Sequence, residues 1–377
     1  MKILFTGGGT GGHFYPIIAV SQALRDKVKE RHLIMPQLFY MAPDKYSPRT
    51  LFDNEINYVY VPAGKLRRYF SILNFFDIFK TATGIIRAII KLYSIYPDVV
   101  FSKGGYASFP TLFAARLLRI PVIIHESDSK PGRVNLWASK FAKKVAISYP
   151  SASKFFKRKP EDIAFTGNPI RKELHMTLTN GANEFLNLES GIPTILILGG
   201  SQGAQNINDT IIEALPELTK RYQVIHMTGK KNFSNVKSLS EIILKDNPFQ
   251  SRYHPFDFLN ELALRMSAGV AKVIISRAGS QIFEIALWNK PSIIIPLPID
   301  ISHDQTNNAF EYAKTGACSV IEETNLSPNI IIEEIDRIVN SPNLYQEMQE
   351  NAKAFAIIDS ADKIADEILD IALSHEV

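Results

Sequence analysis

Short apolar runs alternate with longer amphipathic segments along most of the chain. Most of the runs are continuous rather than alternating, which is typical of strands that are buried on both faces. The segments between them have the period of helices. The pattern therefore predicts an α/β fold with parallel sheets covered by helices. The expected strands are residues 2–6, 37–42, 58–62, 98–103, 121–126 and 144–149, then 193–200, 222–229, 272–279, 291–298 and 318–323.

The strands fall into two series, and each series opens in the same way. The segments "ILFTGGGTGGHFYPIIAV" and "ILILGGSQGAQNINDTII" both read as a strand, a glycine-rich turn and a helix. We interpret them as the starts of two Rossmann-like domains, which bind ligands at the carboxyl ends of their strands. A polar, turn-rich segment separates the two series. We therefore expect domains at 1–165 and 193–340, a linker at 166–192 and a helical tail at 341–377.

Composition narrows the class of protein. A chain of 377 residues with 46% hydrophobic and 21% charged residues is typical of a globular protein. The net charge of +4 is too small for a protein that binds nucleic acid over its whole surface. Cys318 is the only cysteine, which excludes an intramolecular disulfide and a cysteine-based zinc site. Because there is no signal-peptide core and no apolar run of membrane-spanning length, we expect a cytoplasmic protein.

The first glycine-rich turn carries candidate chemistry. Gly7, Gly9 and Gly12 match G-x-G-x-x-G, but a dinucleotide site also needs an acidic residue about 20 residues further on. The nearest candidate, Asp44, lies 32 residues after Gly12, which disfavours NAD and FAD. Bare backbone at a helix N-terminus still suits a phosphate. His13 is then either a general base or acid beside phosphate and sugar, or a residue that only shapes the turn.

Later turns add polar side chains at the expected carboxyl ends of strands. They are Tyr106, His125, Glu126 and Asp128 in the first series, and Ser201, Glu284, His303, Asp304, Gln305 and Asn308 in the second. Such side chains can cap a helix, or they can bind the hydroxyls of ribose and sugar. No D-x-D pair occurs in the chain, so we expect a site without a metal.

Seven segments together carry a resemblance to a known family. They are "GGTGGHFYP", "SKGGYASFP", "HESDSKPG", "FTGNPIR", "LGGSQGA", "SRAGSQIFEIA" and "HDQTNNA". In this order they closely resemble the MurG family of N-acetylglucosaminyltransferases, from Lys2 to about Ala309. The resemblance implies the B-type glycosyltransferase fold, in which two Rossmann-like domains face each other across a cleft and the C-terminal helix returns to the first domain. It also implies a membrane-facing acceptor domain at 1–165 and a UDP-GlcNAc-binding domain at 193–340.

The same resemblance implies the substrates and the site. The donor is expected to be UDP-GlcNAc and the acceptor lipid I, an undecaprenyl diphosphate that carries MurNAc-pentapeptide, with no cofactor. The matching residues are Thr10, Gly11, Gly12, His13, Tyr106, Asp128, Arg171, Ser201, Gly279, Ser280, Glu284 and Gln305. His13 and Asp128 are the candidate catalytic residues, with His13 as the candidate base. Asp128 stands where many members have Asn, and a carboxylate there accepts a hydrogen bond but cannot donate one.

Residues 64–93 are rich in aromatic and basic side chains, and Asp77 is the only acid among them. Cations beside exposed apolar rings suit an anionic membrane surface. The alternative is a pair of core helices with a solvated basic edge. We favour peripheral docking on the cytoplasmic face of the cell membrane. The residues expected at the membrane are Arg67, Arg68, Phe75, Phe76, Phe79 and Lys80.

These observations and the resemblance predict an inverting glycosyltransferase. It would move GlcNAc from UDP-GlcNAc to the MurNAc 4-hydroxyl of lipid I and give lipid II for peptidoglycan. Its partners would be both substrates, the anionic inner membrane surface and other proteins of cell-wall synthesis, but not nucleic acid. Three alternatives stay open: a related transferase for another lipid such as diacylglycerol, a UDP-GlcNAc epimerase that would not need residues 64–93, and a nucleotide-binding module without turnover.

Overall fold

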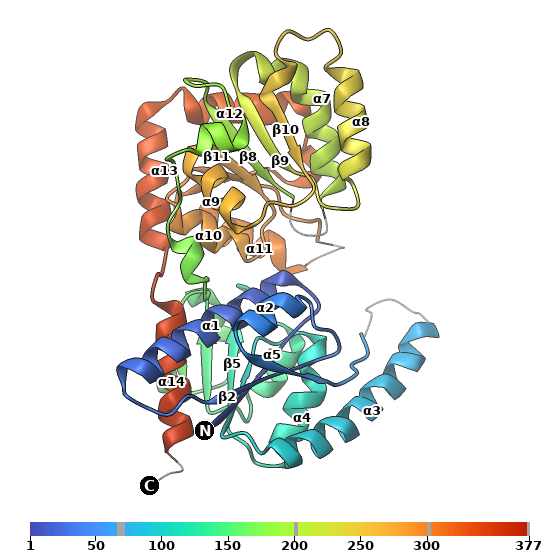
Figure 1. Cartoon of the computed structure of the whole chain (residues 1–377), viewed down its shortest axis with the longest axis vertical. Helices are drawn as coiled ribbons and strands as arrows, with labels where there is room; N and C mark the ends of the chain where they lie inside the picture. The colour runs from blue at the N-terminus through green and yellow to red at the C-terminus, as the bar shows by residue number, and fades with distance from the viewer. Residues whose placement is uncertain (66–71, 200–202, 300–302, 375–377) are drawn as a thin grey trace. The chain divides into compact units, whose positions relative to one another are not determined.

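The computed structural model describes residues 1–65, 72–199, 203–299 and 303–374. It divides the chain into two compact units. Unit 1 comprises Met1–Lys172 and Ile357–Val377, and unit 2 comprises Glu173–Ala356. Each unit is built on one parallel sheet with helices on both faces (Figure 1). The expected α/β fold with two Rossmann-like domains is therefore confirmed.

The described residues of unit 1 form a seven-stranded parallel sheet. In sheet order, its strands are β3 (Ile56–Tyr60), β2 (Gln37–Ala42), β1 (Lys2–Thr6), β4 (Val99–Ser102), β5 (Val122–Glu126), β6 (Lys144–Ile147) and β7 (Ile163–Phe165). The chain order changes direction between β1 and β4. In open parallel sheets, the loops that follow the strands at such a switch point bind ligands. The first glycine-rich turn follows β1, and the segment "KGGY" follows β4.

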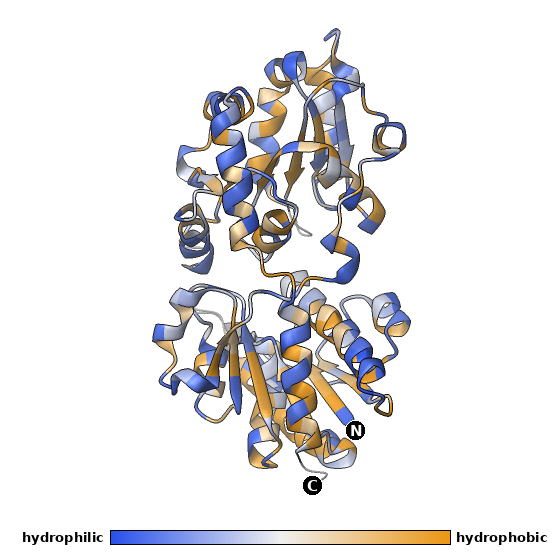
Figure 2. Cartoon of the chain, turned by 90° about the vertical axis from the view of Figure 1, so that its left-hand side faces the viewer, coloured by the Kyte–Doolittle hydropathy of each residue, from blue (hydrophilic) through white to orange (hydrophobic). Residues whose placement is uncertain are grey.

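Helices cover both faces of this sheet. They are α1 (Gly11–Glu30), α2 (Pro48–Asp53), α3 (Ile72–Ile95), α4 (Phe109–Leu117), α5 (Arg133–Ala138) and α14 (Ser360–Leu373). Successive residues of a strand point to opposite faces, so Ile3 and Phe5 lie in the core with α1 and α14, whereas Leu4 lies in the core with α3 and α4. Burial on both faces explains why these runs are continuously apolar. In Figure 2 the strands are drawn largely in the orange of hydrophobic residues.

Unit 2 repeats the plan with a six-stranded parallel sheet among its described residues. In sheet order, its strands are β10 (Tyr253–Phe256), β9 (Gln223–Met227), β8 (Thr194–Leu198), β11 (Ala271–Ser276), β12 (Ser292–Ile294) and β13 (Cys318–Val320). The helices are α6 (Ala182–Leu186), α7 (Gln205–Arg221), α8 (Phe233–Ile243), α9 (Glu261–Val270), α10 (Gln281–Leu287), α11 (His303–Ala313), α12 (Pro328–Val339) and α13 (Pro342–Phe355). The switch point lies between β8 and β11.

Of the two C-terminal helices, only the last belongs to unit 1. The side chains of Met348 and Ala352 on α13 are buried in the cores of unit 2. Ile364 and Ile368 on α14 are buried in the core of unit 1, beside α1. The first unit boundary, after Lys172, falls within the linker expected at 166–192, whereas the second, after Ala356, divides the tail expected at 341–377 between the two units. Helical periodicity shows that a helix has an apolar side, but not which core receives it.

Candidate active site

The first glycine-rich turn places Thr10 and His13 at the N-terminus of α1. Thr10 is the N-cap residue, and its Oγ1 lies 3.0 Å from His13 Nδ1. Gly9 in this turn has a φ of +93°, a conformation that strains any residue with a Cβ. A Cβ on Gly9 would also lie 3.3 Å from the Tyr106 ring. Glycine at this position therefore lets the turn approach Tyr106 closely.

The segment after β4 lies against this turn. Gly105 has a φ of +79°, and a Cβ there would lie 3.4 Å from His13 Nε2. Tyr106 follows directly and begins the short 3-10 helix η1 (Tyr106–Ser108). The two glycine-rich segments thus bring three of the sequence-predicted residues together, namely Thr10, His13 and Tyr106.

Half-buried His13 is neutral at pH 7. Burial and, to a smaller extent, the positive charge of Lys103 lower the pKa of His13 from 6.5 to about 4. In the tautomer whose Nδ1–H donates to Thr10 Oγ1, Nε2 carries the lone pair and faces the backbone of Gly105. This arrangement can accept a proton from a hydroxyl bound beside the glycines. A bound diphosphate would add negative charge and raise the pKa of His13 again.

The end of β5 supplies a second cluster. His125 and Glu126 are buried, and Asp128 is half-buried in the loop that follows. The Glu126 carboxylate accepts hydrogen bonds from Asp128 N, Gly132 N and Asn135 Nδ2, each at 2.9 Å. Glu126 therefore fixes the loop that carries Asp128. Burial, and next the charge of Asp128, raise the pKa of Glu126 to about 7.

The predicted donor-contacting residues are divided between the units. Arg171 lies in unit 1, where its guanidinium carbon is 4.4 Å from the centroid of the Tyr15 ring on α1. Ser201 lies outside the described residues, as do Arg67 and Arg68 of the expected membrane contacts.

The other donor candidates follow β11 and β12 in unit 2. Gly279 and Ser280 precede α10, and a Cβ on Gly279 would have no heavy atom within 4 Å. Glu284 is half-buried in the first turn of α10. Gln305 lies in the first turn of α11, where its Oε1 accepts a hydrogen bond from Leu297 N at 3.1 Å. All four residues thus follow the carboxyl ends of two strands that are paired in the sheet.

Two of the polar residues at this edge hold loops together. Asn308 is buried, and its Nδ2 donates to Ala278 O at 3.2 Å, which joins α11 to the turn after β11. Arg277 forms an ion pair with Glu323, and Glu323 also accepts a hydrogen bond from Asn206 at the start of α7. The sequence did not single out this ion pair, because its two partners lie 46 residues apart and share no motif.

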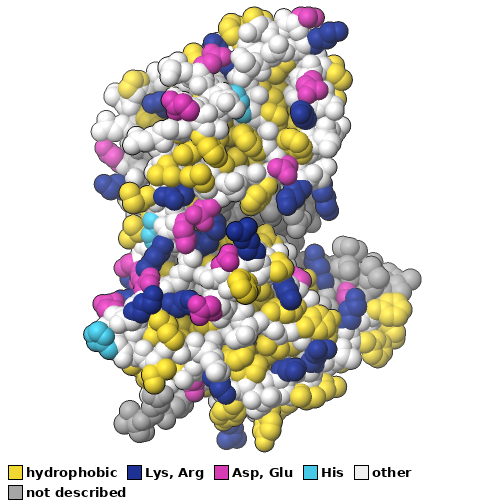
Figure 3. Space-filling model, viewed as in Figure 1, with side chains coloured by type: hydrophobic (Ala, Val, Ile, Leu, Met, Phe, Trp, Pro, Cys, Tyr) yellow, Lys and Arg dark blue, Asp and Glu magenta, His cyan; other side chains and the backbone are white. Residues whose placement is uncertain are grey.

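Residues 64–93 contain one long helix, α3, with a two-part exposed face. Phe75, Phe76 and Phe79 are 60%, 57% and 56% exposed, which excludes these rings from the core. At 100° per residue, one stripe of this helix is apolar and the stripe beside it is basic. The apolar stripe is Phe75, Phe79, Ile86, Ile90 and Tyr93, and the basic stripe is Lys80, Arg87 and Lys91. We call these two stripes the α3 surface, and Figure 3 shows hydrophobic and basic side chains over this part of unit 1.

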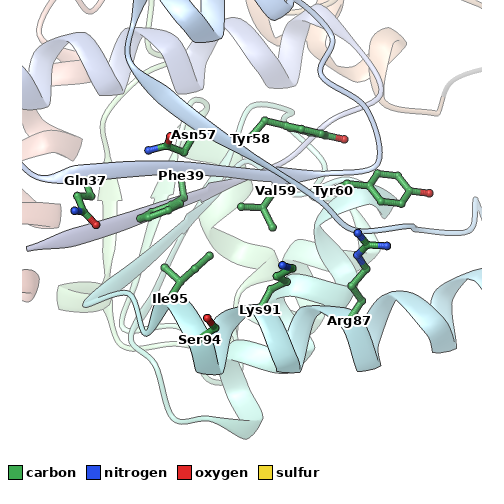
Figure 4. A pocket seen from close by; sticks show the side chains of 10 residues that line it. All are labelled: Gln37, Phe39, Asn57, Tyr58, Val59, Tyr60, Arg87, Lys91, Ser94 and Ile95. Atoms are coloured by element: carbon green, nitrogen blue, oxygen red, sulfur yellow. The ribbon is translucent and has the colours of Figure 1, made fainter.

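A groove of about 650 Å³ lies between α3 and the edge of the sheet. Arg87 and Lys91 extend from α3 toward β3 on one side of it (Figure 4). The guanidinium carbon of Arg87 lies 4.9 Å from the centroid of the Tyr60 ring on β3. The basic stripe thus borders an open, partly apolar depression. Among the described residues, no helix has both the length and the apolar content needed to cross a membrane.

Two family models match the chain. The glycosyltransferase family 28 N-terminal domain matches residues 3–147, and the glycosyltransferase family 28 C-terminal domain matches residues 194–366. A relative from Treponema denticola is 35% identical over 347 residues, which cover 88% of this chain and 86% of that protein. Its name is UDP-N-acetylglucosamine–N-acetylmuramyl-(pentapeptide) pyrophosphoryl-undecaprenol N-acetylglucosamine transferase.

Solved structures share the fold of the whole chain. MurG of Acinetobacter baumannii has a TM-score of 0.71 at 24% identity and covers 98% of this chain and 100% of its own. A UDP-GlcNAc 2-epimerase from Neisseria meningitidis, bound to UDP-GlcNAc, has a TM-score of 0.67 at 17% identity over 98% and 99%. The fold alone therefore does not separate transferases from epimerases. The family matches do separate the two classes, and they define this chain as a glycosyltransferase. The chain belongs to glycosyltransferase family 28, in its MurG branch.

Proposed function

We propose that the protein transfers GlcNAc from UDP-GlcNAc to the 4-hydroxyl of MurNAc in lipid I and so produces lipid II and UDP. The observation that supports this most is the junction of the two glycine-rich segments in unit 1. There a neutral His13 stands in the first turn of the 20-residue helix α1, and its Nε2 lies close to the bare backbone of Gly105. Such a helix end suits a diphosphate, and a neutral imidazole beside it suits the deprotonation of a sugar hydroxyl. The name of the Treponema denticola relative states the same donor, acceptor and transferred sugar.

The proposed reaction is a single displacement. Nε2 of His13 takes the proton of the MurNAc 4-hydroxyl, and O4 attacks C1 of GlcNAc. The bond between C1 and the β-phosphate oxygen of UDP breaks, so the configuration at C1 inverts and UDP leaves. Asp128 accepts a hydrogen bond from a sugar hydroxyl of the acceptor. Tyr106 and Thr10 hold His13 and the turn in place.

The proposed donor site lies on unit 2. Gly279 and Ser280 offer bare backbone to the diphosphate, Glu284 accepts hydrogen bonds from ribose hydroxyls, and Gln305 binds the GlcNAc hydroxyls through its amide. The open space beside Gly279 supports this assignment, because a phosphate can approach the backbone there. No metal is assigned to this site, because the chain has no D-x-D pair that would hold one.

We also propose that unit 1 docks on the inner face of the cell membrane through the α3 surface. Exposed rings beside a basic stripe suit an anionic lipid surface, and the lipid-linked acceptor lies in such a surface. The acceptor diphosphate would then reach the glycine-rich turn at headgroup depth. Other proteins of cell-wall synthesis are candidate partners at the same membrane.

Incubation with UDP-GlcNAc and a defined acceptor tests the proposed function. We expect lipid I to be converted to lipid II with release of UDP, and diacylglycerol to stay unchanged. UDP-GlcNAc incubated without an acceptor should show no epimerised sugar nucleotide. Glycosylation of diacylglycerol in preference to lipid I, or epimerisation without an acceptor, would contradict the proposal.

A further inference from the structure

Lys103 is a buried cation beneath the glycine-rich turn of unit 1. It follows β4, and its side chain is 1% exposed. Its backbone N–H donates to Thr6 O at 3.0 Å, and a Cβ on Gly7 would lie 3.1 Å from Lys103 Cβ. A buried ammonium is costly unless hydrogen bonds and opposite charges compensate for the loss of water.

Lys103 donates hydrogen bonds to acceptors on two other segments. Its Nζ lies 2.7 Å from His125 Nδ1 and 3.1 Å from Asn168 Oδ1. His125 Nε2 lies 2.9 Å from Gly167 O, so Nε2 carries the ring hydrogen and Nδ1 accepts from the ammonium. One side chain therefore joins β4, the end of β5 and the segment that precedes Arg171. These acceptors are neutral, and they leave the charge of the ammonium uncompensated.

The compensating charges are the carboxylates of Glu126 and Asp128, both of which act on Lys103 electrostatically. Glu126 and Asp128 are two residues apart, and Glu126 holds the backbone of Asp128 through a 2.9 Å hydrogen bond. When all three groups are ionised, their charges sum to one negative charge. Without the ammonium, two carboxylates would face an anionic diphosphate across the glycine-rich turn.

We propose that Lys103 is a positioning residue for the acceptor: its buried ammonium holds the end of β5 and offsets the charge of Glu126 and Asp128, so that an anionic diphosphate can bind beside them. The role rests on the proposed function, because it assumes that the diphosphate of lipid I binds at this turn. Neither the motifs nor the relatives assign a role to this lysine. The predicted consequence is that Lys103 and Asp128 act as a coupled pair.

A double-mutant cycle tests the coupling. Lys103→Met should raise the KM for lipid I about tenfold or more, because the diphosphate then meets two uncompensated carboxylates. In the Asp128→Asn background, the same substitution should raise that KM by no more than about threefold, because one of these charges is gone. The KM for UDP-GlcNAc should stay unchanged. Equal effects of Lys103→Met in both backgrounds, or equal losses for both substrates, would overturn the proposal.

The pH dependence gives a readout that a merely structural role would not change. Burial lowers the pKa of Lys103 to about 7, while Glu126 and Asp128 oppose this shift. The other ionisable groups that face it are His13 on α1 and His125 on β5. The KM of the wild type for lipid I should rise as the pH increases through 7, because the ammonium loses its proton. Lys103→Arg keeps its charge and should show a smaller rise, which comes only from the ionisation of Glu126, whose pKa is also about 7; an equal rise in both proteins would contradict the role.

Folding controls keep these outcomes distinct. Thermal unfolding and UDP binding of each variant show whether the fold is intact. If Lys103→Met alone unfolds, the double variant Lys103→Met/Asp128→Asn should have the higher Tm, because it removes both charges; an equal or lower Tm would overturn the pairing. Wild-type protein that does not convert lipid I would refute the proposed function. If the wild type converts lipid I but the effects of Lys103→Met and Asp128→Asn on KM are independent, only the role of Lys103 is refuted.

Discussion

His13 combines a position at a helix N-terminus with a neutral ring, and this combination makes it the leading candidate base. His13→Ala should lower kcat by about 10²–10⁴, because proton transfer in the transition state is lost. Its UDP affinity should stay unchanged, because the proposed donor site lies on unit 2. Steady-state kinetics with lipid I and calorimetry with UDP give both quantities.

Thr10→Val is the matched control for this variant. It removes the hydroxyl that lies 3.0 Å from His13 Nδ1 but keeps the imidazole, so it should lower kcat much less. A His13→Ala variant that keeps kcat and raises only the KM for lipid I would make His13 a positioning residue. Another group in unit 1 would then have to act as the general base.

Two glycines of the proposed sites make a second matched pair. Gly279→Ala should leave the Tm unchanged, because a Cβ there meets no atom within 4 Å, yet it should weaken UDP binding if the diphosphate occupies that space. Gly9→Ala should instead lower the Tm by several degrees, because Gly9 has a φ of +93° and lies against the Tyr106 ring. Thermal unfolding and UDP calorimetry on both variants separate the effects. Unchanged UDP affinity in Gly279→Ala would show that the diphosphate does not bind at this turn.

At the scale of elements, the sequence predicts the inner strands well but misses two of the four edge strands of the described sheets. The strands with two neighbours in their sheet all read as apolar runs, for example "KILFT" and "TILIL". Two strands were missed, β7 and β10, and each is an edge strand with a single partner. β10 reads "YHPF", with a proline that an edge tolerates because one side of the strand needs no ladder hydrogen bond. Edge strands are less buried, so hydrophobic pattern marks them weakly.

The candidate site shows a similar division. Residues on glycine-rich turns, such as Thr10 and Gly279, stand in local motifs that the sequence displays. Lys103 and Arg277 also lie inside such segments, "SKGGYASFP" and "SRAGSQIFEIA", but no motif shows their partners, which lie far along the chain: Asn168 is 65 residues from Lys103. Only folding brings these charges together, and a single sequence gives no sign of the pairing. The motifs therefore predicted the turns but not the charge network beneath the first turn.

His226 links three elements of unit 2 and makes its stability depend on pH. Its Nδ1 lies 3.0 Å from Tyr253 Oη on β10, and its Nε2 lies 3.0 Å from Asn208 Oδ1 on α7. Burial lowers the pKa of His226 from 6.5 to about 3. Below pH 6.5 the unfolded chain binds a proton that the folded one rejects, so stability is complete above pH 6.5 and falls as the pH drops toward 3.

His226→Gln should therefore reduce this dependence on pH. The variant should be less stable at pH 8, because its hydrogen bonds are poorer, but it should lose less stability between pH 6.5 and 5. Through this residue, the free energy of unfolding of the wild type should fall at a rate that approaches about 1.4 kcal/mol per pH unit in that range. Denaturant unfolding of unit 2 at several pH values measures it, with the exposed His32→Asn as control. Parallel pH profiles for His226→Gln and wild type would contradict the assignment.

At the scale of the whole molecule, the proposed docking on the membrane depends on the exposed face of α3. The rings of Phe75 and Phe79 lie in water at a cost that burial in lipid would remove. Each nearby Lys or Arg adds about 1 kcal/mol at an anionic membrane surface. Neither contribution alone holds the protein firmly, so binding should be reversible and should weaken as salt is added.

Vesicles of phosphatidylglycerol and phosphatidylcholine in equal parts test this docking by sedimentation. Replacing the basic stripe, Lys80, Arg87 and Lys91, by Ser should abolish most binding at low salt, and Phe75→Ser/Phe79→Ser should weaken binding at any salt. Neither variant should unfold, because all five side chains are exposed. The matched control replaces Lys231, Lys237 and Lys245 around α8 of unit 2, which changes the net charge equally. An equal loss of vesicle binding in the control would show that only the net charge matters. Wild-type protein that does not bind anionic vesicles at low salt would refute docking through the α3 surface.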